Sequence, residues 1–100
     1  MPLIDTNNPN FKPLNGHGHQ SIPLDATVFT YNVPKQANNV AVQAVTQNIR
    51  MTLDGTAPTA TVGFQLKAGD PAVLVNLADT VTLRFQREAD GAVLEIQAGA

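Results

Sequence analysis

The sequence lacks cysteine and tryptophan, and it has only one tyrosine and four phenylalanines among its 100 residues. The absence of cysteine excludes disulfides, thiol chemistry and every cysteine-based metal site. Charged residues amount to 14%, well below the roughly 25% of an average domain. Such an uncharged polar surface suits a chain that contacts other protein surfaces, because burying charge is costly.

The chain also lacks a basic stripe and a long apolar run. Six Lys and Arg residues stand against eight Asp and Glu residues, which gives a net charge of −2. Without a positive surface to follow a phosphate backbone, we expect no nucleic-acid partner. No stretch reaches the roughly 18 apolar residues of a membrane span, so we expect no membrane partner. Residues 1–5 do not have the pattern of a secretory signal.

The first 24 residues differ in composition from the remainder. Proline and small polar residues dominate here, which disfavours a helix or a central strand. Large apolar side chains are nevertheless spread along this segment: Leu3, Ile4, Phe11, Leu14 and Ile22. We therefore predict an extended arm over residues 1–24, whose apolar residues dock into grooves on its own domain or on a neighbour. A β-domain is predicted over residues 25–100.

From residue 26 onward apolar and polar residues alternate with a period of two, which is typical of half-buried strands. The clearest run places Ile49, Met51 and Leu53 on the core face. Further runs lie over residues 28–33, 40–45, 61–66, 73–75 and 81–86, and a last run follows residue 91. About seven short strands and no helix predict an all-β fold. We expect a small antiparallel β-sandwich, immunoglobulin-like or jelly-roll-like.

One turn signal ends the strand that contains Leu53. Asp54 and Gly55 break the run, and Pro58 stiffens the exit. The following run over residues 61–66 places its apolar residues, Phe64 among them, on one face.

A second turn signal is Asp90-Gly91, which lies between two alternating runs. This pattern predicts a hairpin with a two-residue type I′ turn. The resulting register places Phe85 opposite Ile96 on the core face.

No group of residues forms a catalytic motif. Ser21 is the only serine, and it lacks the strand–turn–helix setting of a nucleophile. His17 and His19 have the spacing of metal ligands, but two ligands rarely make a closed site, and two exposed polar residues on a loop are the simpler interpretation. Arg50 and Arg84 point outward from strands, where they pair with carboxylates or with an anionic partner. We predict no enzyme, no cofactor and no bound metal.

Part of the sequence resembles a known structural corner. Residues 49–59 read IRMTLDGTAPT, which is similar to the YTLDGSxPT corner of small immunoglobulin-like sandwiches, including C-terminal domains of some chitin-degrading enzymes. This corner has no activity of its own.

Longer stretches carry a second resemblance. They read YNVPK at 31–35, AVQAVTQNIR at 41–50, TLDGTAPT at 52–59 and GFQLKAGDP at 63–71. Over about residues 28–97 the chain looks like a family of small proteins encoded among the virion genes of tailed bacteriophages. The resemblance implies a virion component that is made in the host cytoplasm. It carries over no catalytic residues and does not include the arm.

Three functions follow as hypotheses. The first is a capsid decoration or cement protein on the phage head surface, bound to the major capsid protein or other virion proteins as a homo-oligomer such as a trimer. The second is a head–tail connector or tail component, which the sequence does not separate from the first. The third is a carbohydrate- or receptor-binding module, against which the shortage of aromatic residues counts.

Overall fold

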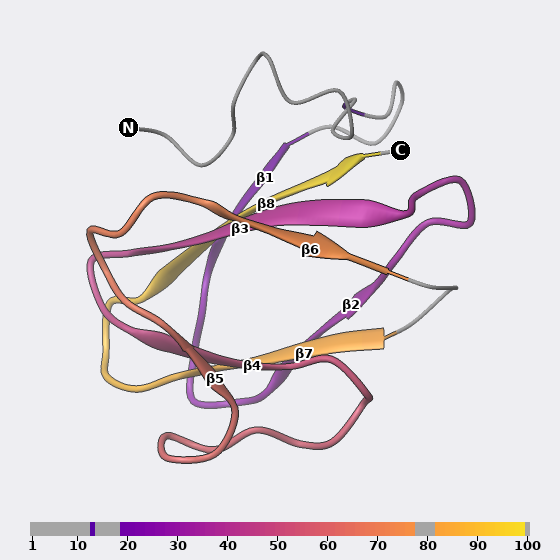
Figure 1. Ribbon diagram of the computed structural model, residues 1–100. Helices are drawn as coiled ribbons and strands as arrows, with labels where there is room; N and C mark the ends of the chain where they lie inside the picture. Colours follow the sequence, from indigo (N-terminus) through magenta and orange to yellow (C-terminus); the bar gives the residue numbers. More distant parts are fainter. Residues whose placement is uncertain (1–12, 14–18, 78–81, 100) are drawn as a thin grey trace.

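The computed structural model describes residues 13, 19–77 and 82–99, and these residues form eight strands and no helix. The strands are β1 (Gln20–Pro23), β2 (Phe29–Asn32), β3 (Asn39–Val45), β4 (Ile49–Thr52), β5 (Phe64–Leu66), β6 (Val73–Asn76), β7 (Thr82–Arg87) and β8 (Val93–Gly99). They make two antiparallel sheets that face each other (Figure 1). The predicted all-β sandwich is confirmed. Within the described ranges there is thus no helix that could cross a membrane.

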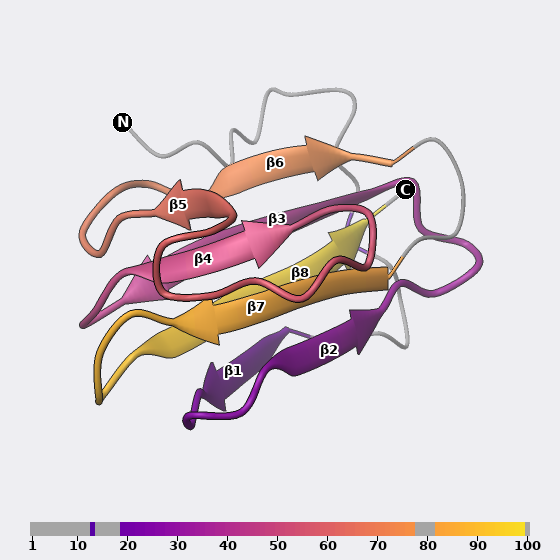
Figure 2. The same ribbon diagram turned by 90° about the horizontal axis from the view of Figure 1, so that it is seen from below.

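The order of the strands identifies the kind of sandwich. Sheet A has the order β1-β8-β3-β6, and sheet B has the order β2-β7-β4-β5 (Figure 2). Strand pairs are nested along the chain: β1 with β8, β2 with β7, β3 with β6, and β4 with β5. This nesting arises when one long two-stranded ribbon folds over into two sheets, which is the jelly roll. Of the two predicted sandwich types, the chain therefore has the jelly-roll topology.

The predicted hairpin around Asp90-Gly91 was wrong. β7 belongs to sheet B and β8 to sheet A, so the connection crosses from one sheet to the other. Phe85 pairs with Phe29 and Met51, not with Ile96. Gly91 has a φ of 92°, whereas Asp90 does not have the positive φ that a type I′ turn requires.

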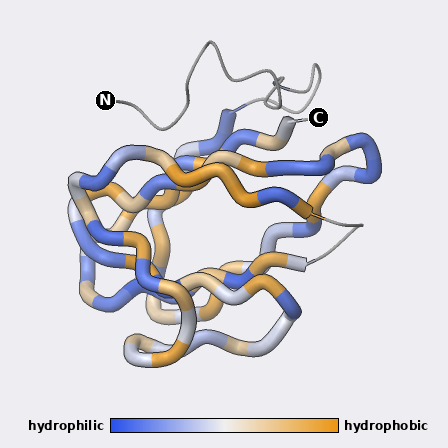
Figure 3. The backbone as a smooth tube through the Cα atoms, in the orientation of Figure 1, coloured by the Kyte–Doolittle hydropathy of each residue, from blue (hydrophilic) through white to orange (hydrophobic). Residues whose placement is uncertain are grey.

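The core lies between the two sheets. Its largest fully buried side chains are Phe85, Ile49, Leu83, Leu94, Ile96, Val40 and Val42. The hydrophobic segments follow the strands, whereas the connection between β2 and β3 is strongly hydrophilic (Figure 3). Burying one such side chain contributes roughly 1.5–3 kcal/mol, so this core is the main stabilising element. The predicted core positions Ile49 and Met51 are buried, while Leu53 is half-buried.

β1 lies inside the range predicted as the arm. It pairs with β8 at the edge of sheet A, a position that tolerates Pro23 at the strand end. Ile22 packs partly buried against the core, so this part of the segment docks on its own domain. Pro13 forms an isolated bridge with Gly99. The other apolar residues assigned to the arm lie outside the described residues: Leu3, Ile4, Phe11 and Leu14.

The strand predicted over residues 61–66 is shorter than expected. β5 begins only at Phe64, after Gly63, which has a φ of 123°. Leu66 is buried at 6% exposure, but the Phe64 side chain is 65% exposed and Val62 is 52% exposed. Within β5 the predicted shared face is present, because Phe64 and Leu66 lie opposite Met51 and Ile49, but on that face only Leu66 is buried. β5 is an edge strand, so it has a neighbour on one side only.

Candidate functional site

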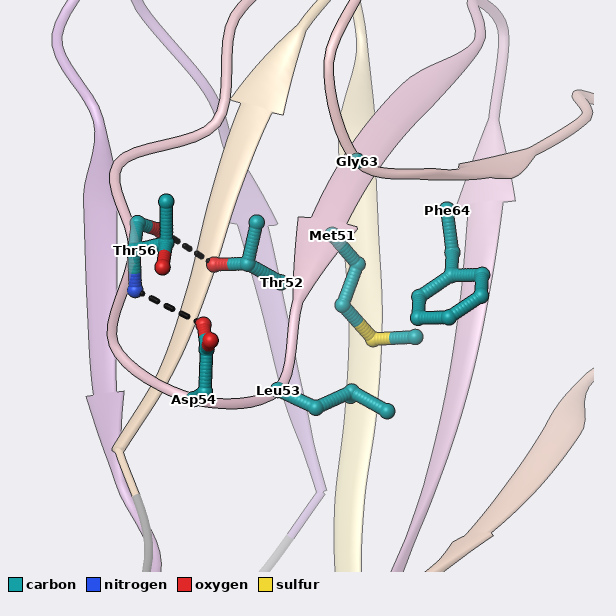
Figure 4. A pocket seen from close by; sticks show the side chains of 7 residues that line it. All are labelled: Met51, Thr52, Leu53, Asp54, Thr56, Gly63 and Phe64. Atoms are coloured by element: carbon teal, nitrogen blue, oxygen red, sulfur yellow. Dashed lines mark hydrogen bonds between the residues drawn. The ribbon is translucent and has the colours of Figure 1, made fainter.

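An open apolar hollow lies beside β5. It has a volume of about 480 Å³ and is lined by Met51, Thr52, Leu53, Asp54, Thr56, Gly63 and Phe64. We call it the edge pocket. Its residues come from the end of β4, from the bend that follows, and from the start of β5. Met51, Leu53 and Phe64 form its apolar side, and Thr52, Asp54 and Thr56 form its polar side (Figure 4).

Gly63 makes the apolar side possible. A Cβ at this position would lie 3.1 Å from the Met51 carbonyl oxygen and 3.2 Å from its nitrogen. Only glycine allows the two backbones to approach this closely at a φ of 123°. The approach brings Phe64 beside Met51 at the mouth of the pocket (Figure 4).

The polar side is held by hydrogen bonds within its own turn. The Thr56 backbone N–H donates to Asp54 Oδ1 at 3.0 Å, and the Thr52 hydroxyl donates to the Thr56 carbonyl. Hydrogen bonds from Thr56, first from its backbone N–H and then from its hydroxyl, lower the pKa of Asp54. Thr52, which makes the second bond, is buried at 8% exposure, although the period-two pattern placed this residue outward. Gly55 in this bend has a φ of 87°, and Pro58 beyond it is buried.

Two arginines form hydrogen bonds with the loop between β4 and β5. Arg50 donates from Nη1 to the Gly63 carbonyl at 3.1 Å, and Arg84 donates from Nη1 to the Gly55 carbonyl at 3.1 Å. Arg50 also donates from Nε to Glu88 at 2.8 Å. The sequence predicted that these arginines pair with carboxylates or with an anionic partner. Arg50 does pair with a carboxylate, that of Glu88, whereas Arg84 donates to a backbone carbonyl. Both side chains therefore fix the loop that forms the edge pocket.

Glu88 anchors the same region from the outer face of sheet B. It accepts a hydrogen bond from Gln65 Nε2 at 2.8 Å in addition to the bond from Arg50. The hydrogen bond from Gln65, followed by the bond and charge of Arg50, lowers the pKa of Glu88. β5 is thus tied down on its polar face while Phe64 stays uncovered.

A second cluster joins β1 to β8. Glu95 accepts a hydrogen bond from the Ser21 hydroxyl at 2.5 Å, and its other oxygen lies 2.5 Å from His19 Nε2. The bond from Ser21, followed by that from His19, lowers the pKa of Glu95. Both bonds end on the carboxylate, so His19 does not face the Ser21 hydroxyl as a catalytic base would. The cluster fastens an edge strand.

The predicted metal pair is only partly described. His17 lies outside the described residues, and His19 faces Glu95. Within the described ranges, no group of three or more His, Asp or Glu side chains is placed to hold a metal ion. In the lining of the edge pocket, Asp54 is the one titratable residue, so the pocket offers apolar contact and shape.

Sequence reasoning missed two of these features. It placed Phe64 on one face with the other apolar residues of 61–66 and did not predict its exposure of 65%, although the Gly63 before it signalled a break in the strand. It did not connect His19 with Glu95, which are 76 positions apart. Comparisons of the chain with protein-family models, with curated proteins and with solved structures give no match.

Proposed function

We propose that this chain is a non-enzymatic structural protein of a bacteriophage virion, and that it decorates the head by binding the lattice of the major capsid protein. The observation that carries the proposal is uncovered apolar surface on an otherwise well-packed domain. Phe64 and Val62 are more than half exposed at one edge of the sandwich. Contiguous apolar surface marks contact with another protein, and we take these two side chains as part of such a surface.

The charged residues support the same proposal. Arg50 bonds Glu88, and Glu95 is bonded to His19 and Ser21, so several charges are engaged within the domain. With only 14% charged residues in the chain, the surface has few charges that must be desolvated when a partner covers it.

The fold adds support by analogy. Jelly rolls recur among viral capsid domains, although a fold alone does not define a function. In a capsid lattice many copies bind side by side, so each single interface can be small. We therefore expect a homo-oligomer that contacts the major capsid protein or other virion proteins.

The test is the copy number of this chain in purified phage particles, measured by quantitative mass spectrometry. A level comparable to the major capsid protein is the expected result. A level that fits a single ring would instead favour the connector or tail component. Absence from the particles would reject both virion roles.

One observation favours a second candidate, a carbohydrate- or receptor-binding module. Phe64 offers an exposed ring on the side of the edge pocket that faces Asp54 and Thr56 (Figure 4), and sugars stack on such rings. Jelly rolls also occur among lectins. A glycan array checks this candidate: specific binding that is lost in Phe64→Ala supports it, and no binding to any glycan rejects it.

A further inference from the structure

We propose that two copies of this chain pair through β6, so that sheet A continues from one copy into the other across a two-fold axis. The inference rests on the proposed function, because it names the surface through which a decoration protein contacts its own neighbour. It combines three observations: an edge strand without protection, a strand sequence that matches itself in the antiparallel direction, and apolar side chains exposed on the same flank.

The unprotected edge belongs to β6. On one side it pairs with β3, and no strand of the described residues pairs with its other side. Proteins usually protect such edges with charged residues or proline. β1 ends in Pro23, and its Ser21 bonds the carboxylate of Glu95, whereas β6 reads VLVN and has neither charge nor proline. Among the four edge strands of the described residues, β6 alone has three consecutive aliphatic residues.

The sequence of β6 selects a second copy as the partner. In an antiparallel pair across a two-fold axis, each strand meets its own sequence in reverse. Val73, Leu74 and Val75 read the same in both directions. Leu74 therefore lies opposite Leu74 of the second copy, and each Val73 lies opposite a Val75. Residues directly opposite each other share a face of the sheet and contact each other, so every aliphatic residue of the strand has an aliphatic neighbour.

Only one register gives this match. Val73 and Val75 lie on the face that points toward sheet B, because their partners on β3 are fully buried, and Leu74 lies on the other face. A slip of one residue would exchange the two faces, so the smallest slip that keeps them is two residues. Such a slip would put Leu74 opposite Ala72 or Asn76. The matched register therefore buries the most aliphatic surface between the copies.

The same contact covers apolar side chains next to β6. β5 and β6 are the edges of the two sheets on one flank of the sandwich, and β1 and β2 are the edges on the opposite flank (Figure 2). Among the described residues, the exposed large hydrophobic ones are Val45, Val62, Phe64 and Val73. Three of them lie on β5, on β6 or just before β5, and only Val45 lies elsewhere, at the end of β3. A two-fold axis beside β6 brings these flanks of the two copies together, where burial of apolar surface favours the complex.

Disulfide trapping in the intact chain tests the register, because the natural sequence contains no cysteine. In Leu74→Cys the two new side chains lie opposite each other at a Cα separation of about 4.5–5.5 Å, which a disulfide can span. The matched control is Asn76→Cys, an exposed position on the same face of the same strand. In the proposed register its two copies are displaced by about 13 Å along the strand. We expect Leu74→Cys to form covalent dimers at least tenfold faster, and equal rates would overturn the proposal.

Hydrogen exchange in the natural chain gives a second test. Every second N–H of an edge strand points outward, and pairing with another strand protects it. As the protein concentration rises, we expect exchange to slow in Val73–Asn76 and to stay constant in Phe29–Asn32, the edge strand on the opposite flank. Exchange in Val73–Asn76 that does not depend on concentration would overturn the proposal.

Sedimentation of the full chain gives a third readout. Val73→Lys puts a charge on the edge of β6 and should weaken self-association tenfold or more, as should Phe64→Ser. Val45→Lys is the matched control and should leave it unchanged, because Val45 is 37% exposed and Val73 is 36% exposed, but only Val73 lies on the proposed interface. Self-association that survives Val73→Lys or Phe64→Ser would overturn the proposal, as would an equal loss in Val45→Lys or a natural chain that stays monomeric at every soluble concentration.

Failure of this inference can be told apart from failure of the proposed function. Coat-level copies in particles without the Leu74 crosslink would reject only the pairing through β6. A specific crosslink in a chain that is absent from particles would reject only the virion role.

Discussion

Two of the four edge strands, β1 and β5, differ in how their side chains are covered. At β1 the carboxylate of Glu95 is bonded to Ser21 and His19, and Ile22 packs against the core. At β5 the polar face is fixed by a bond from Gln65 to Glu88, but Phe64 on the other face is 65% exposed. Exposed edges invite pairing with other chains, so proteins usually protect them. The contrast indicates that the side chains of β1 are used within the domain. β5 is held in place by hydrogen bonds, and its exposed Phe64 ring is open to contact with another chain.

We expect the largest loss of stability from a change in the backbone that positions β5. In Gly63→Ala the new Cβ would meet the Met51 backbone at 3.1–3.2 Å, at a φ that L-residues rarely adopt. Strain and crowding together should cost about 2–3 kcal/mol of unfolding free energy. Urea denaturation followed by circular dichroism measures this loss.

Gly69→Ala is the matched control for that change. Gly69 also has a positive φ of 89°, but nothing lies within 4 Å of a Cβ placed there. This variant should lose only about 1 kcal/mol, because backbone strain is its sole cost. Equal losses in the two variants would contradict a specific close approach between Gly63 and β4.

The next largest loss of stability should come from removing the hydrogen bonds that hold β1 to β8. Glu95→Gln removes the charged acceptor of two hydrogen bonds at a partly exposed position, which should cost about 1 kcal/mol. Hydrogen exchange should then accelerate in Gln20–Pro23 and its partners on β8. Glu88→Gln is the paired change on sheet B and should accelerate exchange in β5 instead. If both variants accelerated hydrogen exchange in the same strand, the idea that Glu95 holds β1 and Glu88 holds β5 would be refuted.

The stabilisation of β1 by Glu95 should depend on pH. Hydrogen bonds from Ser21 and His19 hold the pKa of Glu95 below its ordinary value of 4.5. A lowered folded-state pKa gives stabilisation that is complete above the unfolded value and is lost as the pH falls through the folded value. The stability difference between the natural chain and Glu95→Gln should therefore hold above pH 4.5 and shrink below it. Denaturant titrations from about pH 6 to about pH 3 measure the difference, and a constant value would contradict stabilisation by the hydrogen bonds to Glu95.

The local pattern of the sequence predicts the strands better than their partners. Phe85 and Ile96 both face the core, as the alternation predicts. That alternation is the same whether two strands pair in one sheet or face each other across the sandwich. A turn signal such as Asp90-Gly91 therefore does not show whether the chain stays in one sheet or crosses to the other.

The candidate site depends on the same missing information. Whether Phe64 is covered depends on β5 being an edge strand, and this follows from strand order, which residues 61–66 do not encode by themselves. The hydrogen bonds of Glu95 with Ser21 and His19 depend on the pairing of β1 with β8, two strands from opposite ends of the described chain. The bend at Asp54 is different, because its hydrogen bond runs to Thr56, only two positions away. Local interactions of this kind can be predicted from the residues alone.

The smallest effect on folding should come from a residue that we place in the contact between copies. Because the Phe64 side chain is already 65% exposed, Phe64→Ser should change the unfolding free energy of the monomer by no more than about 0.5 kcal/mol. Denaturation at low protein concentration, where copies do not associate, measures this value. If Phe64→Ser instead costs as much as Glu95→Gln, the ring is part of the folded core and β5 is no more open than β1. A negligible cost together with lost self-association would mean that the ring serves contact between copies, since a residue that the fold does not need has its effect elsewhere.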